Sequence, residues 1–163
     1  MLIISKEFNA TPKQVFNAWS KAESIVAWWG PEGFTTEVKT FDFKPGGTFH
    51  YVIKDGKGMD MWGLFSYQEI REPNHLIFIN SFSNPAAEVV KAPEVPFGKH
   101  WPLKMINTLR LDEKDGITTL ELTIEPYQAT TEERNTFNAN TQNVKMGFEG
   151  TFTQLTNFLK SRL

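Results

Sequence analysis

A long amphipathic pattern near the C-terminus, from Thr131 to about Lys160, constrains the fold of this sequence more than any other feature. Thr130 and Glu133 have the Ser/Thr-x-x-Glu spacing of a capping box, which marks the start of a helix. Large apolar residues then recur every seven, four or three positions along one stripe, namely Phe137, Val144, Phe148, Phe152, Leu155 and Leu159. We therefore expect one helix of roughly 45 Å, which is long enough to cross a small domain.

The two halves of this expected helix differ in the side chains that they would turn inward. From Arg134 to Asn143 the inward side carries Asn140 and Thr141 around one large apolar residue, Phe137. From Val144 onward the inward side is dense with apolar residues. We expect the second half to pack in the core and the first half to form the wall of a cavity.

The sequence before this helix predicts a strand, two short helices and then six strands. Thr11 and Pro12 mark the start of the first helix, because a capping residue precedes proline at the first helical position. The run Trp28-Trp29-Gly30-Pro31 ends the second helix, and from Phe34 the apolar residues alternate with period two. The expected ranges are 2–9 for the first strand, 12–19 and 21–27 for the helices, and 34–43, 49–53, 59–71, 76–82, 103–111 and 117–125 for the other strands. No repeat or linker divides the chain, so we expect residues 1–163 to form a single domain.

Aromatic residues are abundant, with 14 Phe and 5 Trp among 163 residues. Several would turn toward the C-terminal helix, where they could line a ligand cavity or pack together as a filled core, and both interpretations stay open. A proline-rich loop from Asn84 to Pro102 would lie near the mouth of such a cavity. The candidate ligand-binding residues are Trp28, Trp29, Phe41, Phe43, Phe49, Tyr51, Phe78, Asn80, Phe82, His100, Trp101, Asn107, Phe137, Asn140, Thr141 and Val144.

The sequence gives little sign of catalytic or metal chemistry. Cysteine is absent, and the three histidines, His50, His75 and His100, are too far apart in sequence for a metal-binding motif. No Gly-x-Ser-x-Gly elbow is present, and the paired glycines lie in predicted turns. We therefore expect no catalytic residues, no metal and no cofactor.

Two of the histidines and the strand carboxylates are expected to be solvated. His50 lies opposite Phe49 in its strand, so it should face solvent if Phe49 faces the cavity. His75 lies in a turn, where a solvated side chain is expected. The same expectation applies to the outward-facing acids Asp42, Asp60 and Glu69.

The strand at 59–71 has large apolar residues on both predicted faces. Met61, Phe65 and Tyr67 share one face, and Trp62, Leu64 and Ile70 share the other. Burial on both sides explains this pattern, and a homodimer contact is the alternative.

Charge and hydropathy limit the partners and the compartment. The formal net charge is −2 with acids and bases interspersed, which gives no electrostatic footprint for nucleic acid. No stretch approaches the ~20 apolar residues of a membrane span, and the N-terminus reaches a charged residue too soon for a signal peptide. We therefore expect a cytoplasmic protein with no nucleic-acid partner and no membrane span.

Several ordered motifs carry a resemblance to a known family. They are Thr11-Pro12 leading to Val15-Phe16-Asn17-Ala18-Trp19, Trp28-Trp29-Gly30-Pro31, Pro45-Gly46-Gly47, Gly63 to Pro73, Trp101-Pro102-Leu103, and Gly147-Phe148 through Leu155. The chain resembles the START-like (SRPBCC) superfamily, in the bacterial branch similar to the C-terminal domain of the activator of heat-shock protein 90 ATPase. The resemblance implies an α+β helix-grip fold, in which a curved antiparallel sheet of about seven strands wraps around a long C-terminal helix, with two short helices after the first strand.

The resemblance leaves three classes of function open, because this fold hosts lipid carriers, hormone receptors and enzymes. Binding of a small hydrophobic or aromatic molecule, such as a lipid, is the first expectation. A cyclase- or hydrolase-like enzyme would have to use the polar residues Asn80, Asn107, Asn140 or His100. The family name also implies a chaperone-ATPase cofactor with a role in the stress response.

Overall fold

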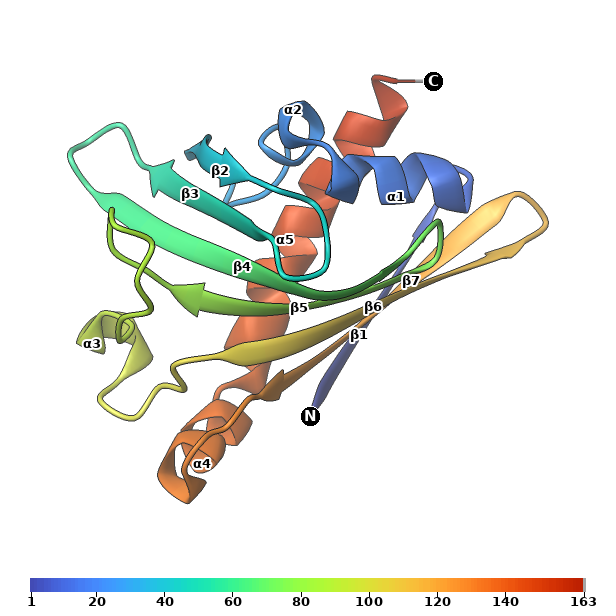
Figure 1. Cartoon of the computed structure of the whole chain (residues 1–163). Helices are drawn as coiled ribbons and strands as arrows, with labels where there is room; N and C mark the ends of the chain where they lie inside the picture. Colours follow the sequence, from blue (N-terminus) through green and yellow to red (C-terminus); the bar gives the residue numbers. More distant parts are fainter. Residues whose placement is uncertain (163) are drawn as a thin grey trace.

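The computed structural model describes residues 1–162, with all of their side chains except that of Val95. Its elements follow the expected order of a strand, two short helices, six strands and a C-terminal helical region (Figure 1). One short helix at Glu94–Phe97 was not expected, because it lies in the segment that was predicted to be a loop. They are β1 (Leu2–Phe8), α1 (Pro12–Ser20), α2 (Ala22–Ile25), β2 (Thr35–Phe41), β3 (Thr48–Lys54), β4 (Asp60–Arg71), β5 (His75–Phe82), α3 (Glu94–Phe97), β6 (Met105–Lys114), β7 (Ile117–Pro126), α4 (Thr131–Ala139) and α5 (Thr141–Lys160).

The strands form one antiparallel sheet in the order β1-β7-β6-β5-β4-β3-β2. The sheet is curved, and α5 crosses one of its faces (Figure 1). Helices α1 and α2 lie near the C-terminal end of α5, and α4 lies at the opposite end (Figure 1). This arrangement confirms the predicted α+β helix-grip fold.

Capping boxes start both α1 and α4, as the sequence predicts. The Thr11 hydroxyl accepts a hydrogen bond from the backbone N–H of Gln14, whose side chain accepts from the backbone N–H of Thr11. Thr130 and Glu133 make the same pair of contacts at the start of α4. Each box satisfies two backbone donors that a helix start would otherwise leave without partners.

The prediction of one unbroken C-terminal helix was wrong, because the helix is interrupted at Asn140, between α4 and α5. Its backbone leaves the helical region, with φ −120° and ψ 14°. The Asn140 side-chain nitrogen donates to the carbonyl of Thr136 at 2.8 Å. Asparagine competes in this way with regular helical hydrogen bonding, so it favours a helix end. None of the helices in residues 1–162 has the length and apolar character needed to cross a membrane.

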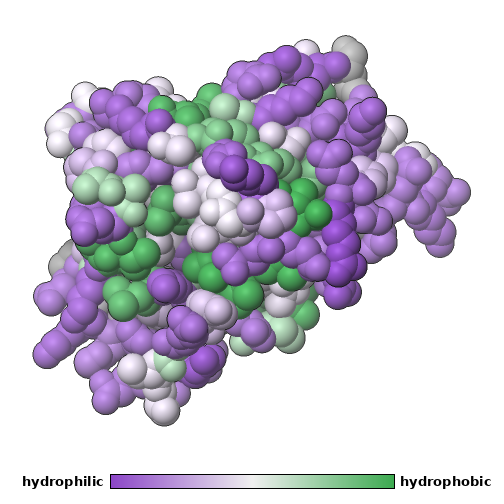
Figure 2. All heavy atoms as spheres, in the orientation of Figure 1, coloured by the Kyte–Doolittle hydropathy of each residue, from purple (hydrophilic) through white to green (hydrophobic). Residues whose placement is uncertain are grey.

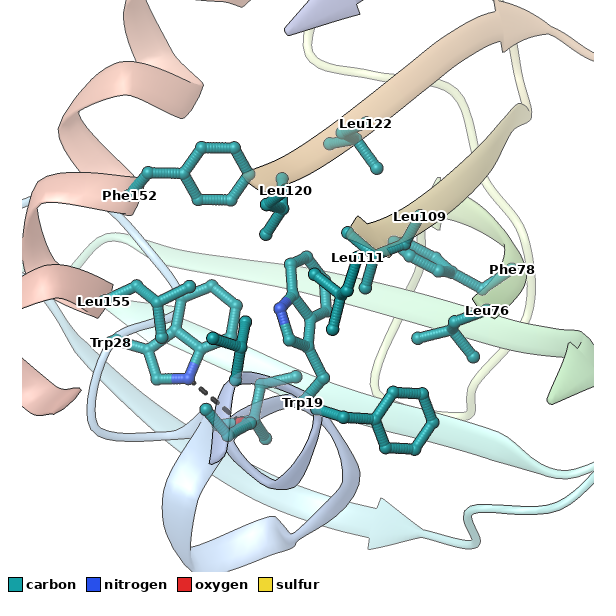
Figure 3. Packing of buried hydrophobic residues seen from close by; sticks show 14 of the residues in the cluster. Trp19, Trp28, Leu76, Phe78, Leu109, Leu111, Leu120, Leu122, Phe152 and Leu155 are labelled. Carbon is teal, nitrogen blue, oxygen red and sulfur yellow. Dashed lines mark hydrogen bonds between the residues drawn. The ribbon is translucent and has the colours of Figure 1, made fainter. Parts of the chain in front are cut away.

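The core is concentrated around two tryptophans from the first helical segment. Trp19 and Trp28 lie edge to face with ring centroids 4.8 Å apart, and each side chain is about 1% exposed. Figure 3 shows them between Phe152 and Leu155 of α5 on one side and the leucines of β6 and β7 on the other. The Trp28 indole N–H donates to the buried carbonyl of Ala18 at 3.0 Å, which satisfies its only polar atom. This core joins α1 and the C-terminal half of α5 to the sheet.

An irregularity in β4 changes which face Ile70 occupies. Tyr67 pairs with Phe78, but Glu69 pairs with Ile77, so the register shifts by one residue between them. Ile70 therefore packs against the core opposite Leu76. The prediction that Ile70 shares a face with Trp62 was wrong, because a bulge reverses the alternation.

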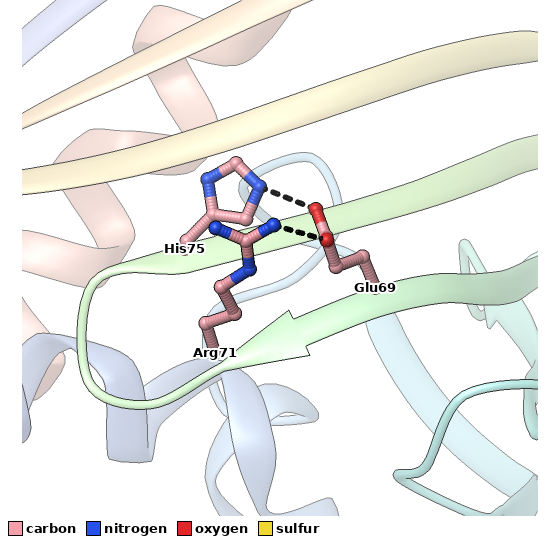
Figure 4. Close-up of polar contacts among 3 residues, drawn as sticks. All are labelled: Glu69, Arg71 and His75. Carbon is pink, nitrogen blue, oxygen red and sulfur yellow. Dashed lines mark hydrogen bonds and ion pairs between the residues drawn. The ribbon is translucent and has the colours of Figure 1, made fainter.

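The bulge places a polar cluster beside the hairpin that joins β4 and β5 (Figure 4). The Glu69 carboxylate accepts from Arg71 Nη2 at 2.6 Å, and its other oxygen lies 2.9 Å from His75 Nε2. The His75 side chain is only 18% exposed. The expectation that His75 and Glu69 are simply solvated was therefore wrong.

His50 also differs from its prediction, because it is buried although it lies on the outer face of the sheet. It is 4% exposed, stacks on Trp62 at 5.3 Å, and its Nε2 lies 3.1 Å from the carbonyl of Asn84. The chain after β5 folds back near this point, since Ser83 forms a bridge with Val89. Strand alternation cannot anticipate a loop that covers the outer face.

Apolar side chains also occur on the rest of the outer face. Figure 2, in the orientation of Figure 1, shows hydrophobic groups among hydrophilic ones on this side of the molecule. Leu64, Ile77, Ile79 and Ile106 are half-buried at the outward positions of β4, β5 and β6. A homodimer contact through this face stays a prediction.

Candidate functional site

A pocket of about 330 Å³ lies between the sheet and the N-terminal half of α5. The sheet contributes Tyr51, Ile53, Met61, Trp62, Gly63, Asn80, Ser81, Phe82, Met105, Asn107 and Ile124. Helix α5 contributes Asn143, Val144, Gly147, Phe148 and Thr151. The turn after α2 contributes Trp29, Gly30 and Pro31, and the loop before β6 contributes Phe97, Trp101, Pro102 and Leu103. The walls are therefore mainly apolar, with a few amide and hydroxyl groups.

The polar part of the pocket centres on Tyr51 of β3 and Asn80 of β5. The Asn80 side-chain nitrogen donates to the Tyr51 phenol oxygen at 3.3 Å and to the carbonyl of Leu64 at 3.2 Å. A backbone carbonyl can only accept, so this contact fixes which end of the Asn80 amide is the nitrogen. The two side chains thus form a defined pair across the intervening strand β4.

Gly63 in β4 makes this pair possible. It pairs with Tyr51 on one side and with Phe82 on the other. A Cβ atom at Gly63 would collide with the ring and the hydroxyl of Tyr51. Because glycine has no side chain, the Tyr51 ring can lie across β4 and reach Asn80.

Asn107 of β6 adds a second amide on the same face. It is 2% exposed, and its side-chain nitrogen donates to the carbonyl of Met105 at 3.3 Å. Met105 is the residue that pairs with Asn80, so Asn107 lies diagonally across from Asn80. Tyr51, Asn80 and Asn107 therefore form the polar end of the pocket.

The pocket lining among the described residues contains no Asp, Glu, Lys, Arg or His. Its one titratable side chain is Tyr51. Burial raises the pKa of this phenol, and the hydrogen-bonding side chains of Trp29 and Asn80 partly oppose that effect. The Tyr51 hydroxyl therefore stays neutral at neutral pH and can donate a hydrogen bond.

The turn that carries Trp29 is held between β2 and α5. Thr36 of β2 donates through its hydroxyl to the carbonyl of Trp29, and Gln154 of α5 donates to the carbonyl of Gly30. The Trp29 ring makes edge contacts with Phe65 at 5.0 Å and with Phe148 at 6.0 Å. These contacts fix one aromatic wall of the pocket.

A chain of aromatic contacts holds the loop before β6 against the pocket. The ring centroids are 5.0 Å apart for Phe82 and Phe97, 5.5 Å apart for Phe97 and Trp101, and 6.1 Å apart for Trp101 and Phe137 of α4. His100 points elsewhere, with Nδ1 3.4 Å from the Glu132 carboxylate and about half of its side chain exposed. The loop therefore contributes apolar rings, and not an imidazole, to the pocket.

The structure brings seven of the sixteen candidate residues together at the pocket. They are Trp29, Tyr51, Asn80, Phe82, Trp101, Asn107 and Val144. Six others belong to the core or pack against it, namely Trp28, Phe41, Phe43, Phe49, Phe78 and Phe137. The last three, His100, Asn140 and Thr141, lie outside both the pocket lining and the core. The pocket and the filled core thus adjoin on the same sheet face, and Tyr51 belongs to both.

The predicted division of the C-terminal helix was wrong in its position. Phe137 in the first part is fully buried, whereas the wall of the pocket runs from Asn143 to Thr151. The tightly packed part begins at Thr151 and includes Phe152, Leu155 and Leu159. The break at Asn140 separates Phe137 in α4 from the pocket wall in α5, and the apolar stripe alone does not reveal it.

Sequence reasoning missed the two glycines that shape the pocket, Gly63 and Gly147. Glycine in an otherwise apolar strand is a signal of close approach by another group, so Gly63 could have been identified. Gly147 lies in the middle of α5 and lines the pocket without any close neighbour for an added Cβ. A glycine within a helix costs about 1 kcal/mol of stability relative to alanine. This unfavourable choice of residue was the signal that could have drawn attention to Gly147.

Several solved structures share this fold. A protein from Staphylococcus epidermidis, solved by NMR, is 23% identical, with a TM-score of 0.77 over 99% of this chain and 90% of that chain. A protein from Arthrobacter aurescens is 21% identical, with a TM-score of 0.77 over 98% of this chain and 85% of that chain. The AHSA1 protein from Silicibacter pomeroyi is 16% identical, with a TM-score of 0.74 over 99% of both chains. At these identities the similarity shows the fold alone.

Sequence comparison adds the family. No curated protein is similar enough in sequence to match the chain. The family of Activator of Hsp90 ATPase homolog 1-like proteins matches residues 9–160. Because this match covers nearly the whole chain and agrees with the resemblance in its motifs, the chain belongs to the family of Activator of Hsp90 ATPase homolog 1-like proteins.

Proposed function

We propose that the protein binds a small hydrophobic or aromatic molecule in the pocket between the sheet and α5. The observation that carries this proposal is the pocket itself, with a volume of about 330 Å³ and a mainly apolar lining. Pockets of this size and character, with a few oriented polar groups, are typical of small-molecule sites. The rings of Trp29, Phe82, Trp101 and Phe148 would contact the ligand.

Binding without chemistry is the form of this proposal that the side chains favour. A general acid or base must titrate near the working pH, and the described lining has no carboxylate, imidazole or amine. Two of the polar residues that an enzyme was expected to use, Asn140 and His100, do not line the pocket. Asn80 and Asn107 would orient a ligand through their amides.

The name of the family refers to activation of the Hsp90 ATPase. A role as a chaperone cofactor would depend on an outer surface of the protein, and a ligand role depends on the pocket. A change confined to the pocket therefore separates the two functions.

The experiment is a titration with N-phenyl-1-naphthylamine, an uncharged apolar dye whose fluorescence rises in apolar surroundings. The pocket-filling variant is Gly147→Phe, because Gly147 lines the pocket and an added Cβ there meets no atom within 4 Å. The matched control is Gly150→Phe, since Gly150 is also free of close neighbours and lies outside the pocket lining.

We expect the native chain and Gly150→Phe to bind the dye saturably at one site, and Gly147→Phe to bind it at least tenfold more weakly. Free ligand at a concentration of 100 times its dissociation constant should also stabilise the native chain by about 2.7 kcal/mol. Absence of saturable binding to the native chain, or equal binding by both variants, would contradict the proposal.

A further inference from the structure

We propose that the pocket selects uncharged, mainly apolar molecules that carry a hydroxyl group, and that Tyr51 and Asn80 bind this hydroxyl. This inference rests on the proposed ligand-binding function and names the chemical class of the ligand. It comes from the hydrogen-bonding capacity that the pair has left after its contacts within the protein.

Asn80 has an unused acceptor at the pocket. Its side-chain nitrogen already donates to the Tyr51 oxygen and to the carbonyl of Leu64, which uses both of its N–H groups. Its side-chain oxygen accepts no hydrogen bond from any residue that the structure describes. This oxygen is therefore available to a donor on a ligand.

Tyr51 has an unused donor beside that acceptor. Its phenol oxygen accepts from Asn80 and also has Trp29 as a hydrogen-bonding side chain. An indole N–H can only donate, so the phenol O–H itself has no acceptor among residues 1–162. The residue is 5% exposed, so water has little access to the hydroxyl from outside the pocket. A buried donor without a partner is unfavourable, and an acceptor on a ligand would remove this cost.

A hydroxyl group fits this pair with a single atom, because it can accept from Tyr51 and donate to Asn80 at the same time. A ketone or ether oxygen can accept from Tyr51 but leaves the Asn80 oxygen without a donor. A pure hydrocarbon satisfies neither group. Alcohols and phenols are therefore the favoured class.

The absence of charge from the described lining excludes an ionised ligand head. A carboxylate placed beside Tyr51 and Asn80 would lose its hydration and meet no cationic side chain. It would also face the Asn80 oxygen, which repels it. The pocket should therefore reject a fatty-acid-like or aryl carboxylate that has the same apolar body as a favoured alcohol.

The polar pair also sets the orientation of the ligand. Tyr51 and Asn80 lie on the sheet, whereas Val144 and Phe148 line the pocket from α5. The hydroxyl would point to the sheet and the apolar body would lie against α5.

The test compares probes that share an apolar body, namely 2-naphthol, naphthalene and 2-naphthoate, together with 1-octanol and octanoate. Each probe displaces N-phenyl-1-naphthylamine from the protein at pH 7. We expect 2-naphthol to bind at least about tenfold more tightly than 2-naphthoate, and about 3- to 10-fold more tightly than naphthalene. Octanol should bind at least about tenfold more tightly than octanoate.

Two tyrosine variants locate the selectivity. Tyr51→Phe keeps the ring and removes the hydroxyl, so it should lose the preference for 2-naphthol over naphthalene, with both affinities measured against the same variant. Tyr67→Phe is the matched control, because Tyr67 is also buried in the sheet and its hydroxyl has no described partner. Tyr67 does not line the pocket, so the Tyr67→Phe protein should keep the native preference for 2-naphthol over naphthalene.

The outcomes separate this inference from the proposed function. Dye binding together with equal or tighter binding of the carboxylates would overturn the inference and leave the ligand-binding function intact. Unchanged selectivity in Tyr51→Phe would overturn the role of Tyr51 in the same way. If the dye and all five probes fail to bind, both proposals are wrong.

Discussion

At the scale of single residues, we expect the same substitution, glycine to alanine, to change stability in opposite directions at two positions. Gly63→Ala should destabilise the protein by about 1–3 kcal/mol, because the new methyl group collides with the Tyr51 ring. Gly150→Ala should stabilise it by about 0.5–1 kcal/mol, since Gly150 lies within α5 with no atom close to an added Cβ. Urea unfolding of both variants measures the two effects. Destabilisation of equal size in both variants would contradict the role of Gly63 in accommodating Tyr51.

The cluster around Glu69 predicts a dependence of stability on pH. The Arg71 guanidinium and then His75 lower the pKa of Glu69 from its ordinary value of 4.5. The folded chain therefore binds a proton at Glu69 less readily than the unfolded chain does. The ionised carboxylate thus stabilises the fold fully at pH values above its ordinary pKa of 4.5. The contribution disappears as the pH falls through the lowered pKa.

Comparison of Glu69→Gln with the native chain in urea at pH 7, 5 and 3 measures this contribution. The native chain should have the higher midpoint at pH 7, and the difference should shrink toward pH 3. Glu113→Gln is the control, because the exposed Glu113 side chain makes no described ion pair or hydrogen bond. A difference for Glu69→Gln that grows on acidification would rule out this account of the cluster.

Sequence alternation predicted which residues face α5 but not how deep each one lies. Phe49 and Tyr51 share a face, as do Phe78 and Asn80, yet only Tyr51 and Asn80 line the pocket. The packing partner decides between core and pocket, and that partner comes from distant segments of the chain. Local pattern therefore identified the face, and tertiary contacts decided the site.

At the scale of elements, the strand and helix order followed from local signals, whereas breaks within elements did not. Capping boxes and proline marked the starts of α1 and α4 correctly. The bulge after Tyr67 and the helix break at Asn140 had no comparable signal, because each depends on a single backbone adjustment. The bulge accounts for the error at Ile70, and the break accounts for the wrong prediction of one unbroken C-terminal helix.

The break between α4 and α5 gives a prediction about Asn140. Asn140→Ala removes the hydrogen bond to Thr136 and should destabilise the protein by about 0.5–1.5 kcal/mol. Dye affinity should stay within about twofold of native, because Asn140 does not line the pocket. Unfolding and dye titration check both parts, with Asn138→Ala as a control on the exposed side of α4. A large loss of affinity would instead place Asn140 in the binding site.

At the scale of the whole molecule, one end is a packed core and the other end holds the pocket. No side chain from Thr141 to Gly150 is buried, whereas the following segment includes Thr151, Phe152 and Leu155 in the core. Segments with few buried contacts open more readily than packed ones. The two halves of α5 should therefore differ in stability although they form one helix.

Hydrogen exchange tests this difference. Amides from 141 to 150 should exchange faster than those from 151 to 160 in the free protein, and a pocket ligand should slow the first group more than the second. Uniform exchange along α5, with or without ligand, would contradict the division into core and pocket wall.

The most direct test of the binding site is a chemical-shift map of isotope-labelled protein titrated with 2-naphthol. The account predicts that the side-chain amides of Asn80 and Asn107 and the backbone amides of Gly147 and Phe148 shift together and saturate at one equivalent. Shifts confined to the outer face of the sheet, or to the region around α1 and α2, would show that the pocket is not the ligand site.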